Sequence, residues 1–326
     1  MVYFKIEIGL SRRAQANLQK METGCHETDG WTAATAEMER LKAAGRYKTA
    51  ANYLTAIRSW SHYLGDNRWR FAQMTADEMA CFQRWLTADQ GLCLNTVSAY
   101  MRCLRALYNK VMGLKNESAE DNPFIHVFTG RSRTRKRSAT ADVLQRLKNL
   151  PLADEPSLAM ARDLFLFGFM AMGMPFVDMA YLRTEQVADG IIRYTRHKTG
   201  QPINVPISSQ MESIMQRYAD PQSVFVFPIL DGSNSANQYR HYRHALRRYN
   251  RALQLLSDRI GAQPRLSSYV VRHTWASLAY QHHLSIEQIG KGLGHTKVST
   301  TMIYIKNLFD KDLAEANDAM LKELGL

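Results

Sequence analysis

At 326 residues the chain is longer than a single compact core usually requires, and this length favours two domains. Hydrophobic residues make up 45% of it and charged residues 22%, which is typical of a globular protein and excludes disorder along the whole chain. The formal net charge of +12 indicates a polyanionic partner, because each Lys or Arg placed on a phosphate releases condensed counterions. A basic protein without such a partner is the alternative that charge alone leaves open.

The chain shows no signature of a metal, a cofactor or a membrane. A nucleotide-binding glycine loop, an HExxH motif and zinc-ligand spacings are all missing, so neither a cofactor nor a metal is expected. No apolar run is long enough to span a bilayer, and the N-terminus lacks the order of a signal peptide. We therefore expect a cytoplasmic protein with buried free thiols at most of its four cysteines, which are Cys25, Cys81, Cys93 and Cys103.

The first part of the chain predicts an extension followed by a helical domain. Residues 1–30 form the extension, and a short strand is predicted at its start from the alternation of Val2, Phe4, Ile6 and Ile8. Residues 31–127 then show helical periodicity, which predicts an all-α domain of about four helices. Thr75 followed by Glu78 predicts a capping box at the start of one of them.

Basic residues mark two places where this part of the chain is expected to contact a polyanion. The helix in NTVSAYMRCLRALYNKVMG has an apolar face and a second face with Arg102, Arg105 and Lys110. Residues 128–138 follow as a linker with no apolar period. A solvated hinge is one interpretation, and a hinge that wraps a phosphate backbone is the favoured one, given the basic cluster Arg131, Arg133, Arg135, Lys136 and Arg137.

Residues 139–326 predict a second domain of helices with one hairpin. In IIRYTRHKTGQPINVPI, two runs rich in β-branched residues flank the turn 198–201, which is typical of a β-hairpin. The stretch NSANQYRHYRHALRRYNRALQLL predicts a helix with the apolar stripe Tyr242, Leu246, Tyr249, Leu253 and Leu256. A charged helix face is usually only solvated, but a nearly unbroken positive face favours a helix lying along a DNA groove, here with Arg240, Arg243, His244, Arg247 and Arg251.

Four residues of this second domain have the chemistry for phosphodiester transfer. A tyrosine oxygen such as that of Tyr304 can attack phosphorus and hold the strand covalently. An arginine such as Arg272 offers a rigid fork to the non-bridging oxygens. Lys198 or His295 can protonate the leaving oxygen. Taken singly, each has a structural interpretation: a core tyrosine, a buried arginine, a turn lysine and a helix-end histidine.

Taken together, these residues stand in a pattern that resembles the tyrosine recombinase, or phage integrase, family. VVRHTWASLAYQHHLSIEQIGKGLGHTKVSTTMIYIK is similar to that family's C-terminal motif, with His295 23 residues after Arg272 and Tyr304 nine residues later. RHKTGQPINVPI resembles the hairpin of the catalytic lysine. The resemblance covers roughly residues 32–310. The segments FVDMAYL and SSYVVRHTWAS are most similar to the Bacteroidetes branch of integrases and invertases.

The resemblance implies a mainly α fold with a small β-hairpin or sheet. An N-terminal four-helix SAM-like core-binding domain and a mixed α+β catalytic domain (139–326) would form a C-shaped clamp on double-stranded DNA. The chain would be a site-specific recombinase that integrates, excises or inverts a mobile element. Monomers would assemble into a homo-tetramer on DNA through the last helix in FDKDLAEANDAMLKEL, and accessory DNA-bending proteins are possible partners.

The resemblance also implies a role for each site residue. Tyr304 would be the nucleophile that forms a 3′-phosphotyrosyl link, and Arg272 would hold the scissile phosphate. His295 would support that phosphate, and Lys198 would be the general acid. Tyr269 stands three residues before Arg272, where the family usually has histidine or lysine, and a phenol can still bind a phosphate there.

The sequence departs from the family at the first of its two clamp arginines. Pro175 stands where the common GxRxxE pattern has arginine, with Asp178 in the acidic place, and Met172 stands where the related branch has it. Arg183 and Arg162 are candidate substitutes. A catalytically impaired recombinase-fold DNA-binding protein is therefore the alternative. A DNA regulator with a core tyrosine and a type IB topoisomerase are more distant ones.

Overall fold

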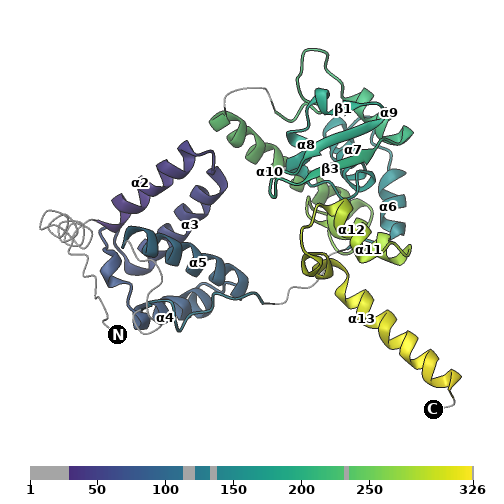
Figure 1. Ribbon diagram of the computed structural model, residues 1–326. Helices are drawn as coiled ribbons and strands as arrows, with labels where there is room; N and C mark the ends of the chain where they lie inside the picture. Colours follow the sequence, from purple (N-terminus) through teal and green to yellow (C-terminus); the bar gives the residue numbers. More distant parts are fainter. Residues whose placement is uncertain (1–28, 113–121, 133–137, 231–234, 325–326) are drawn as a thin grey trace, which may run out of the picture. The chain divides into compact units, whose positions relative to one another are not determined.

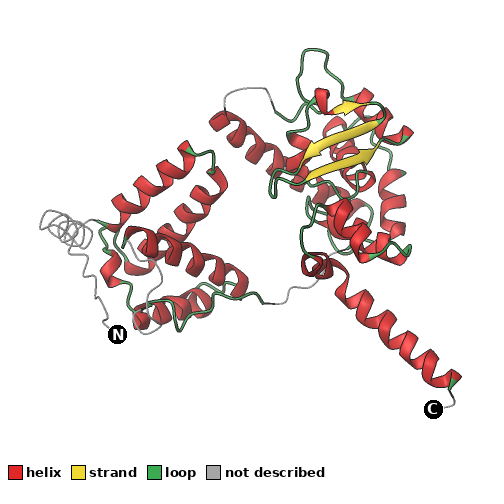
Figure 2. Ribbon diagram, viewed as in Figure 1, coloured by secondary structure: helices red, strands yellow, loops and turns green. Residues whose placement is uncertain are grey.

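The structure is a computed structural model that describes residues 29–112, 122–132, 138–230 and 235–324. The chain divides into two compact units, Met1–Thr134 and Arg135–Leu326. Both are built mainly from helices, and the one sheet among the described residues lies in the second unit (Figure 2). The strand expected near Val2 lies outside the described residues. Within those residues, no helix combines the length and the apolarity needed to cross a membrane.

The first unit is a helical bundle, as the periodicity of residues 31–127 predicted (Figure 1). An aromatic cluster fills its core, in which Trp60 contacts Phe82 edge to face at a ring-centroid separation of 5.1 Å. Such pairs are favourable beyond the area they bury. The helices are α2 (Gly30–Ala43), α3 (Tyr47–Leu64), α4 (Ala76–Arg84) and α5 (Leu94–Val111), with a 3-10 turn at Phe71–Gln73 and a π turn at Trp85–Asp89.

Two local predictions for this unit need correction. Thr75 caps α4 by accepting a hydrogen bond from the Glu78 N–H (3.2 Å). The reciprocal half of the capping box is not made, because the Glu78 carboxylate accepts from the Tyr63 hydroxyl (2.7 Å). The buried thiols were also predicted wrongly, since Cys81 and Cys93 are free but exposed. Cys81 lies on the solvent-facing side of α4, Cys93 lies just before α5 begins, and Cys25 lies outside the described residues.

The second unit packs helices around a small antiparallel sheet. Its helices are α6 (Ala141–Lys148), α7 (Pro156–Met170), α8 (Phe176–Ala180), α9 (Ser209–Arg217), α10 (Ser235–Arg259), α11 (Val270–Gln281), α12 (Ile286–Leu293) and α13 (Val298–Glu323), with a 3-10 turn at Thr184–Gln186. The largely apolar α7 lies at the centre, in contact with α10 on one side and α11 on another. A continuous core of aliphatic and aromatic side chains joins these elements.

The sheet has the order β1–β2–β3, with β1 at Val187–Ala188, β2 at Ile191–Thr195 and β3 at Pro202–Pro206. The pairing of β2 with β3 confirms the predicted hairpin. Ile192 pairs with Val205 in the middle of it, and both side chains are buried. Side chains alternate between the two faces of a strand, so every second residue of β2 faces the core. The two-residue β1 was too short to be seen in the sequence.

The long helices α10 and α13 carry the features that the sequence indicated, with one difference. In α10, Tyr249, Leu253 and Leu256 are buried, and the basic residues lie on the exposed face as predicted. The predicted C-terminal helix is not separate. It is the continuation of α13, which begins at Val298 and runs without a break past Tyr304 to Glu323.

A buried threonine ties the start of the second unit to α11. The Thr274 hydroxyl donates to the Val270 carbonyl (2.9 Å) and accepts from the Ala139 N–H (2.9 Å). No part of Thr274 is exposed. Its hydroxyl is therefore the acceptor that satisfies a backbone N–H that water does not reach.

Thr274→Val should lower the free energy of unfolding by roughly 1–3 kcal/mol, because the N–H of Ala139 would stay buried without an acceptor. Differential scanning calorimetry should show a lower Tm. Thr55→Val is the control, because Thr55 is exposed and water can replace its hydroxyl. A Thr274→Val variant as stable as the wild type would contradict this role.

Candidate functional site

The residues singled out in the sequence come together in the second unit from four elements. Arg272 lies on α11, His295 follows α12, Tyr304 lies on α13 and Lys198 lies in the turn between β2 and β3. These elements contact one another: α11 meets α12 and α13, and α12 meets β3. Residues more than 100 positions apart therefore share one site.

The end of α12 organises the site through its last carbonyl groups. Gly294 ends the helix in the left-handed conformation (φ +63°). A Cβ atom there would lie 2.7 Å from Ile203 Cδ1, so the hairpin approaches too closely for any other residue. The carbonyls of Leu293 and Gly294 consequently face the interior of the site, where they accept hydrogen bonds from arginine side chains.

Arg272 is held in a fixed position by backbone carbonyls. Only 2% of it is exposed. Its Nη1 donates to the carbonyl of Gly173 (3.1 Å) and its Nη2 donates to the carbonyl of Leu293. Gly173 also needs to be glycine, because its φ is +73° and a Cβ would lie 3.2 Å from the Arg272 Cα. The guanidinium is thus positioned before any ligand arrives.

His295 completes this arrangement as a neutral imidazole. Its Nε2 lies 3.2 Å from Arg272 Nη2, and its Nδ1 lies 3.0 Å from the Thr301 hydroxyl. Since arginine can only donate, Nε2 is the acceptor and Nδ1 carries the proton. Burial, followed by the positive charges of Arg272 and Arg196, lowers the pKa of His295 to about 4. The ring therefore stays uncharged at neutral pH.

Tyr304 lies beside both of these residues. Its ring stacks on that of His295 with a centroid separation of 5.5 Å, and it lies 4.5 Å from the ring of His273. Its hydroxyl lies near the Arg272 guanidinium and the Tyr269 phenol, where it opposes the lowering of the Arg272 pKa and adds to the rise of the Tyr269 pKa. Tyr304 is 7% exposed, as a core tyrosine would be, but its hydroxyl faces a guanidinium instead of an ordinary structural partner.

The arginine expected near Met172 or Pro175 is replaced from a different element, which the sequence analysis missed. Arg196, in the turn after β2, is 8% exposed. Its Nη1 donates to the carbonyls of Leu293 (3.1 Å) and Gly294 (3.3 Å). Arg272 binds the same Leu293 carbonyl, so the two guanidinium groups are neighbours. The signal was available, because Arg196 continues the buried face of β2 two residues after Tyr194.

The substitutes named from the sequence were wrong. Arg183 is at the surface and pairs with Glu185 (2.7 Å). Arg162 forms an ion pair with Asp163 (2.9 Å) rather than with a group of the site. Met172 does not enter the site either. Its backbone has φ +55°. Its side chain packs against Gly292 of α12, because its sulfur lies 3.3 Å from where a Cβ atom on Gly292 would be.

Two buried guanidinium groups side by side leave the site with an excess of positive charge. Burial lowers the pKa of Arg272, and the charge of Arg196 lowers it further. The Nε atoms of both arginines are buried and have no hydrogen-bond partner in the described part of the chain. The nearby acid is Asp178, whose pKa is raised by burial in spite of both arginines. Buried donors without partners indicate a place for an anion.

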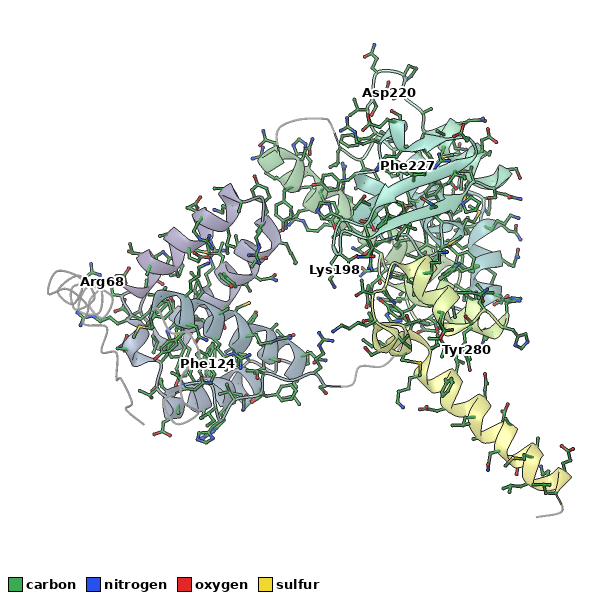
Figure 3. All side chains as sticks on the ribbon, viewed as in Figure 1. Arg68, Phe124, Lys198, Asp220, Phe227 and Tyr280 are labelled. Atoms are coloured by element: carbon green, nitrogen blue, oxygen red, sulfur yellow. The ribbon has the colours of Figure 1, made fainter. Side chains whose placement is uncertain are left out.

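Lys198 stands at the exposed turn of the hairpin, where Figure 3 shows its side chain leaving the ribbon. The turn is closed by hydrogen bonds from the N–H groups of Thr199 and Gly200 to the Arg196 carbonyl (3.3 and 2.9 Å). Gly200 has φ +68°. The charge of Lys198 contributes to the lowered pKa of His295, so its ammonium lies within electrostatic reach of the site.

The predicted DNA-contacting residues are exposed in the described part of the chain, except Arg105. Arg240, Arg243, His244 and Arg247 lie along α10, and Arg247 Nη2 is 3.2 Å from His244 Nδ1. In the first unit, Arg102 is exposed and Arg105 is half-buried on α5. Lys110 is committed elsewhere, to Glu37 (2.6 Å). Arg133, Arg135 and Lys136 lie outside the described residues. Across the described ranges, no three His, Cys, Asp or Glu side chains gather to hold a metal ion.

Comparisons with known proteins agree with this geometry. The phage integrase family matches residues 137–311, and the phage integrase SAM-like domain matches residues 32–128. The tyrosine recombinase XerD of Shewanella oneidensis is 23% identical over 269 residues, which cover 78% of this chain and 85% of XerD. The integrase of Escherichia phage P2 is 24% identical over 135 residues, 41% of this chain and 34% of that protein.

Solved structures show the same fold. XerH site-specific recombinase bound to a palindromic difH substrate, in a post-cleavage complex, superposes with a TM-score of 0.58 at 15% identity, covering 87% of this chain and 85% of that one. A lambda integrase (75–356) dimer bound to a COC′ core site gives 0.57 at 17% identity, covering 84% and 94%. A lambda integrase tetramer bound to a Holliday junction gives 0.54 at 16%, covering 91% and 88%.

Proposed function

This chain belongs to the phage integrase family and is a site-specific tyrosine recombinase, and we propose that it cleaves DNA with Tyr304 in the site of Arg196 and Arg272. The observation that carries the proposal is the pair of buried guanidinium groups with unpartnered Nε atoms beside the Tyr304 hydroxyl. A phosphate beside the two guanidinium groups would neutralise their excess positive charge. The alternative of an impaired DNA-binding protein is not favoured.

In the proposed reaction the Tyr304 oxygen attacks the scissile phosphorus, and its proton passes to water. The new O–P bond holds the strand as a 3′-phosphotyrosine while the bond to the 5′ oxygen breaks. Lys198 gives a proton to that leaving oxygen. Arg272 and Arg196 hold the non-bridging oxygens, whose charge changes in the transition state. Neutral His295 keeps Arg272 in place, and Tyr269 lies near the Tyr304 hydroxyl, where its phenol can orient the attacking oxygen.

We infer that DNA lies against the exposed basic faces of α5 and α10, with the linker 128–138 on the phosphate backbone between them. Basic residues of both units would contact the phosphates and so make a clamp. They are Arg102 and Arg105 on one unit, Arg240, Arg243, His244 and Arg247 on the other, and Arg133, Arg135 and Lys136 in the linker. Accessory DNA-bending proteins would assist where the site must bend.

We also propose that the chain belongs to the Bacteroidetes branch of the family, because its segment FVDMAYL resembles that branch. We propose that it acts in the cytoplasm, where its DNA substrate would be.

We propose that α13 joins protomers into a tetramer on DNA by docking on a second copy of the chain. Its 26 residues form one helix of roughly 39 Å, so its far end cannot fold back on its own unit. Leu313 and Leu324 are 61% and 65% exposed there, on a stripe that also includes Ala316 and Met320. Such an unpartnered apolar stripe marks an interaction surface.

The second unit offers a matching acceptor, a groove of about 930 Å³. Its floor is apolar, and at its edge Arg162 and Arg217 both pair with Asp163, which leaves Lys148 as the positive charge there that forms no ion pair within the described part of the chain. Beyond Lys306, α13 carries five acidic residues with described positions, Asp310, Asp312, Glu315, Asp318 and Glu323. Opposite charges around an apolar contact favour one partner over others. The groove is lined by Leu144, Leu166, Phe169, Trp275 and Leu278, and by Lys148, Arg162 and Arg217 at its edge.

Tyr304→Phe should abolish the covalent adduct, because the attacking oxygen is removed while the ring and its packing stay. The substrate is a nicked duplex of the site that the wild-type chain selects from random-sequence DNA. Adducts are counted on denaturing gels. Binding of the intact duplex should remain within about twofold, since phosphate contacts supply most of the affinity. Adduct formation that persists in the Phe variant would remove Tyr304 from the nucleophile role.

Arg196→Ala and Arg196→Lys should each slow adduct formation by roughly 100–1000-fold, the effect of losing one donor to a transition-state oxygen. The lysine variant keeps a charge but not the fork that reaches both the carbonyls and the phosphate. Arg183→Ala is the matched control and should cleave normally. Met172→Arg should bring no gain, because Arg196 already supplies the second guanidinium. Wild-type rates in Arg196→Ala would refute its role.

Met320→Asp should prevent tetramers on DNA by placing a charge on the apolar stripe of α13. Light scattering of complexes with a Holliday junction of the selected site should find smaller assemblies. Binding of one protomer to a half-site should not change, because that residue lies far along the helix from Tyr304. Ala314→Asp adds the same charge on a different face of α13 and is the control, because Ala314 is exposed and is not three or four residues from any residue of the stripe. Equal tetramer yields from both variants would contradict docking through α13.

A further inference from the structure

The residues on either side of Lys198 are anchored, although Lys198 itself is exposed. Arg196 is fixed by the carbonyls at the end of α12. His197 is fixed twice. Its backbone N–H donates to Asp178 Oδ1 (3.0 Å), and its ring stacks on Tyr181 with a centroid separation of 5.0 Å and an interplanar angle of 15°. An exposed histidine side chain is thus held flat against an aromatic ring one residue before the lysine.

Tyr181 is itself supported by rings of the core. It lies 6.0 Å from the ring of Tyr242 on α10. Tyr242 stacks on Phe176 of α8 at 6.1 Å, and Phe176 stacks on Tyr249 at 4.5 Å. Tyr249 is fully packed inside the unit, so the series of rings runs from the core to the surface of the hairpin. The platform under His197 is consequently rigid, while the turn at Lys198 has no such support of its own.

A tight turn of this kind transmits the position of one residue to the next. The N–H groups of Thr199 and Gly200 both bond to the Arg196 carbonyl, so His197 and Lys198 lie inside one closed turn whose first residue is held separately by the α12 carbonyls. If the His197 ring leaves Tyr181, the Lys198 backbone loses its orientation on one side. Proton transfer requires the donor nitrogen to lie within hydrogen-bond distance of the leaving oxygen, and small displacements lower its rate strongly.

We propose that Tyr181 and His197 are positioning residues that stack to hold Lys198 in place for proton transfer to the leaving 5′ oxygen. The proposal rests on the proposed function, in which Lys198 is the general acid. It assigns His197 and Tyr181 no contact with the DNA. Their effect is confined to the step that needs the proton, and this separates positioning from general structural support.

The test compares two nicked duplexes of the selected site, one with the natural oxygen at the scissile 5′ position and one with a bridging sulfur there. A thiolate leaves without a proton, so the sulfur substrate does not need the general acid. His197→Ala and Tyr181→Ala should cleave the oxygen substrate roughly tenfold more slowly, the most that one aromatic pair shifts an equilibrium. Both should cleave the sulfur substrate within about twofold of wild type.

Variants that keep an aromatic ring provide the matched controls. His197→Phe and Tyr181→Phe should cleave both substrates at nearly wild-type rates, which also excludes an effect of the histidine nitrogens. His126→Ala, an exposed histidine of the first unit, should change neither rate. If His197→Ala slows both substrates equally, or slows neither, the positioning role is wrong.

Lys198→Ala shows which proposal fails. Rescue of this variant by sulfur supports Lys198 as the acid, and the His197→Ala ratio then decides the stacking role by itself. A Lys198→Ala variant that sulfur does not rescue overturns the general acid, and the positioning role with it. A wild-type chain that forms no adduct with either substrate overturns the proposed function.

Discussion

The site depends on the Leu293 carbonyl, which accepts hydrogen bonds from both Arg272 and Arg196. Without an acceptor between them, two buried guanidinium groups would repel each other in a region that water does not screen. The carbonyl lies at the C-terminus of α12, where the helix dipole adds partial negative charge. It therefore holds the positive pair together and compensates part of their repulsion.

The surrounding sequence follows from this constraint. Gly294 is required where the helix turns its last carbonyls toward the arginines, and Gly173 is required where a second carbonyl meets Arg272. Asp178 occupies the acidic place of the family motif. It binds the backbone of the hairpin at His197 rather than a guanidinium, so it does not cancel the positive charge that the phosphate needs. Most of the motif thus serves to place two cations.

The sequence predicted the helices, the hairpin and the grouping of Arg272, His295 and Tyr304 because periodicity and motif spacing are local properties. It did not predict Arg196, since the family motif directed attention to the helix end near Met172. Only packing shows that β2 delivers a guanidinium to the same carbonyl. The exposed thiols and the unbroken α13 were missed for a similar reason: local pattern does not say which side of a helix is covered or whether a helix continues.

We propose that the hairpin supplies the second guanidinium as well as the general acid. In a site with an arginine at a helix end, the clamp on the phosphate and the general acid belong to different elements. Here Arg196 and Lys198 stand two residues apart on one turn, but their anchors are separate. The α12 carbonyls hold the Arg196 guanidinium, and the stack on Tyr181 holds the His197 ring beside Lys198. In this proposal, loss of the first anchor changes the charge around the phosphate, and loss of the second changes only the departure of the 5′ oxygen.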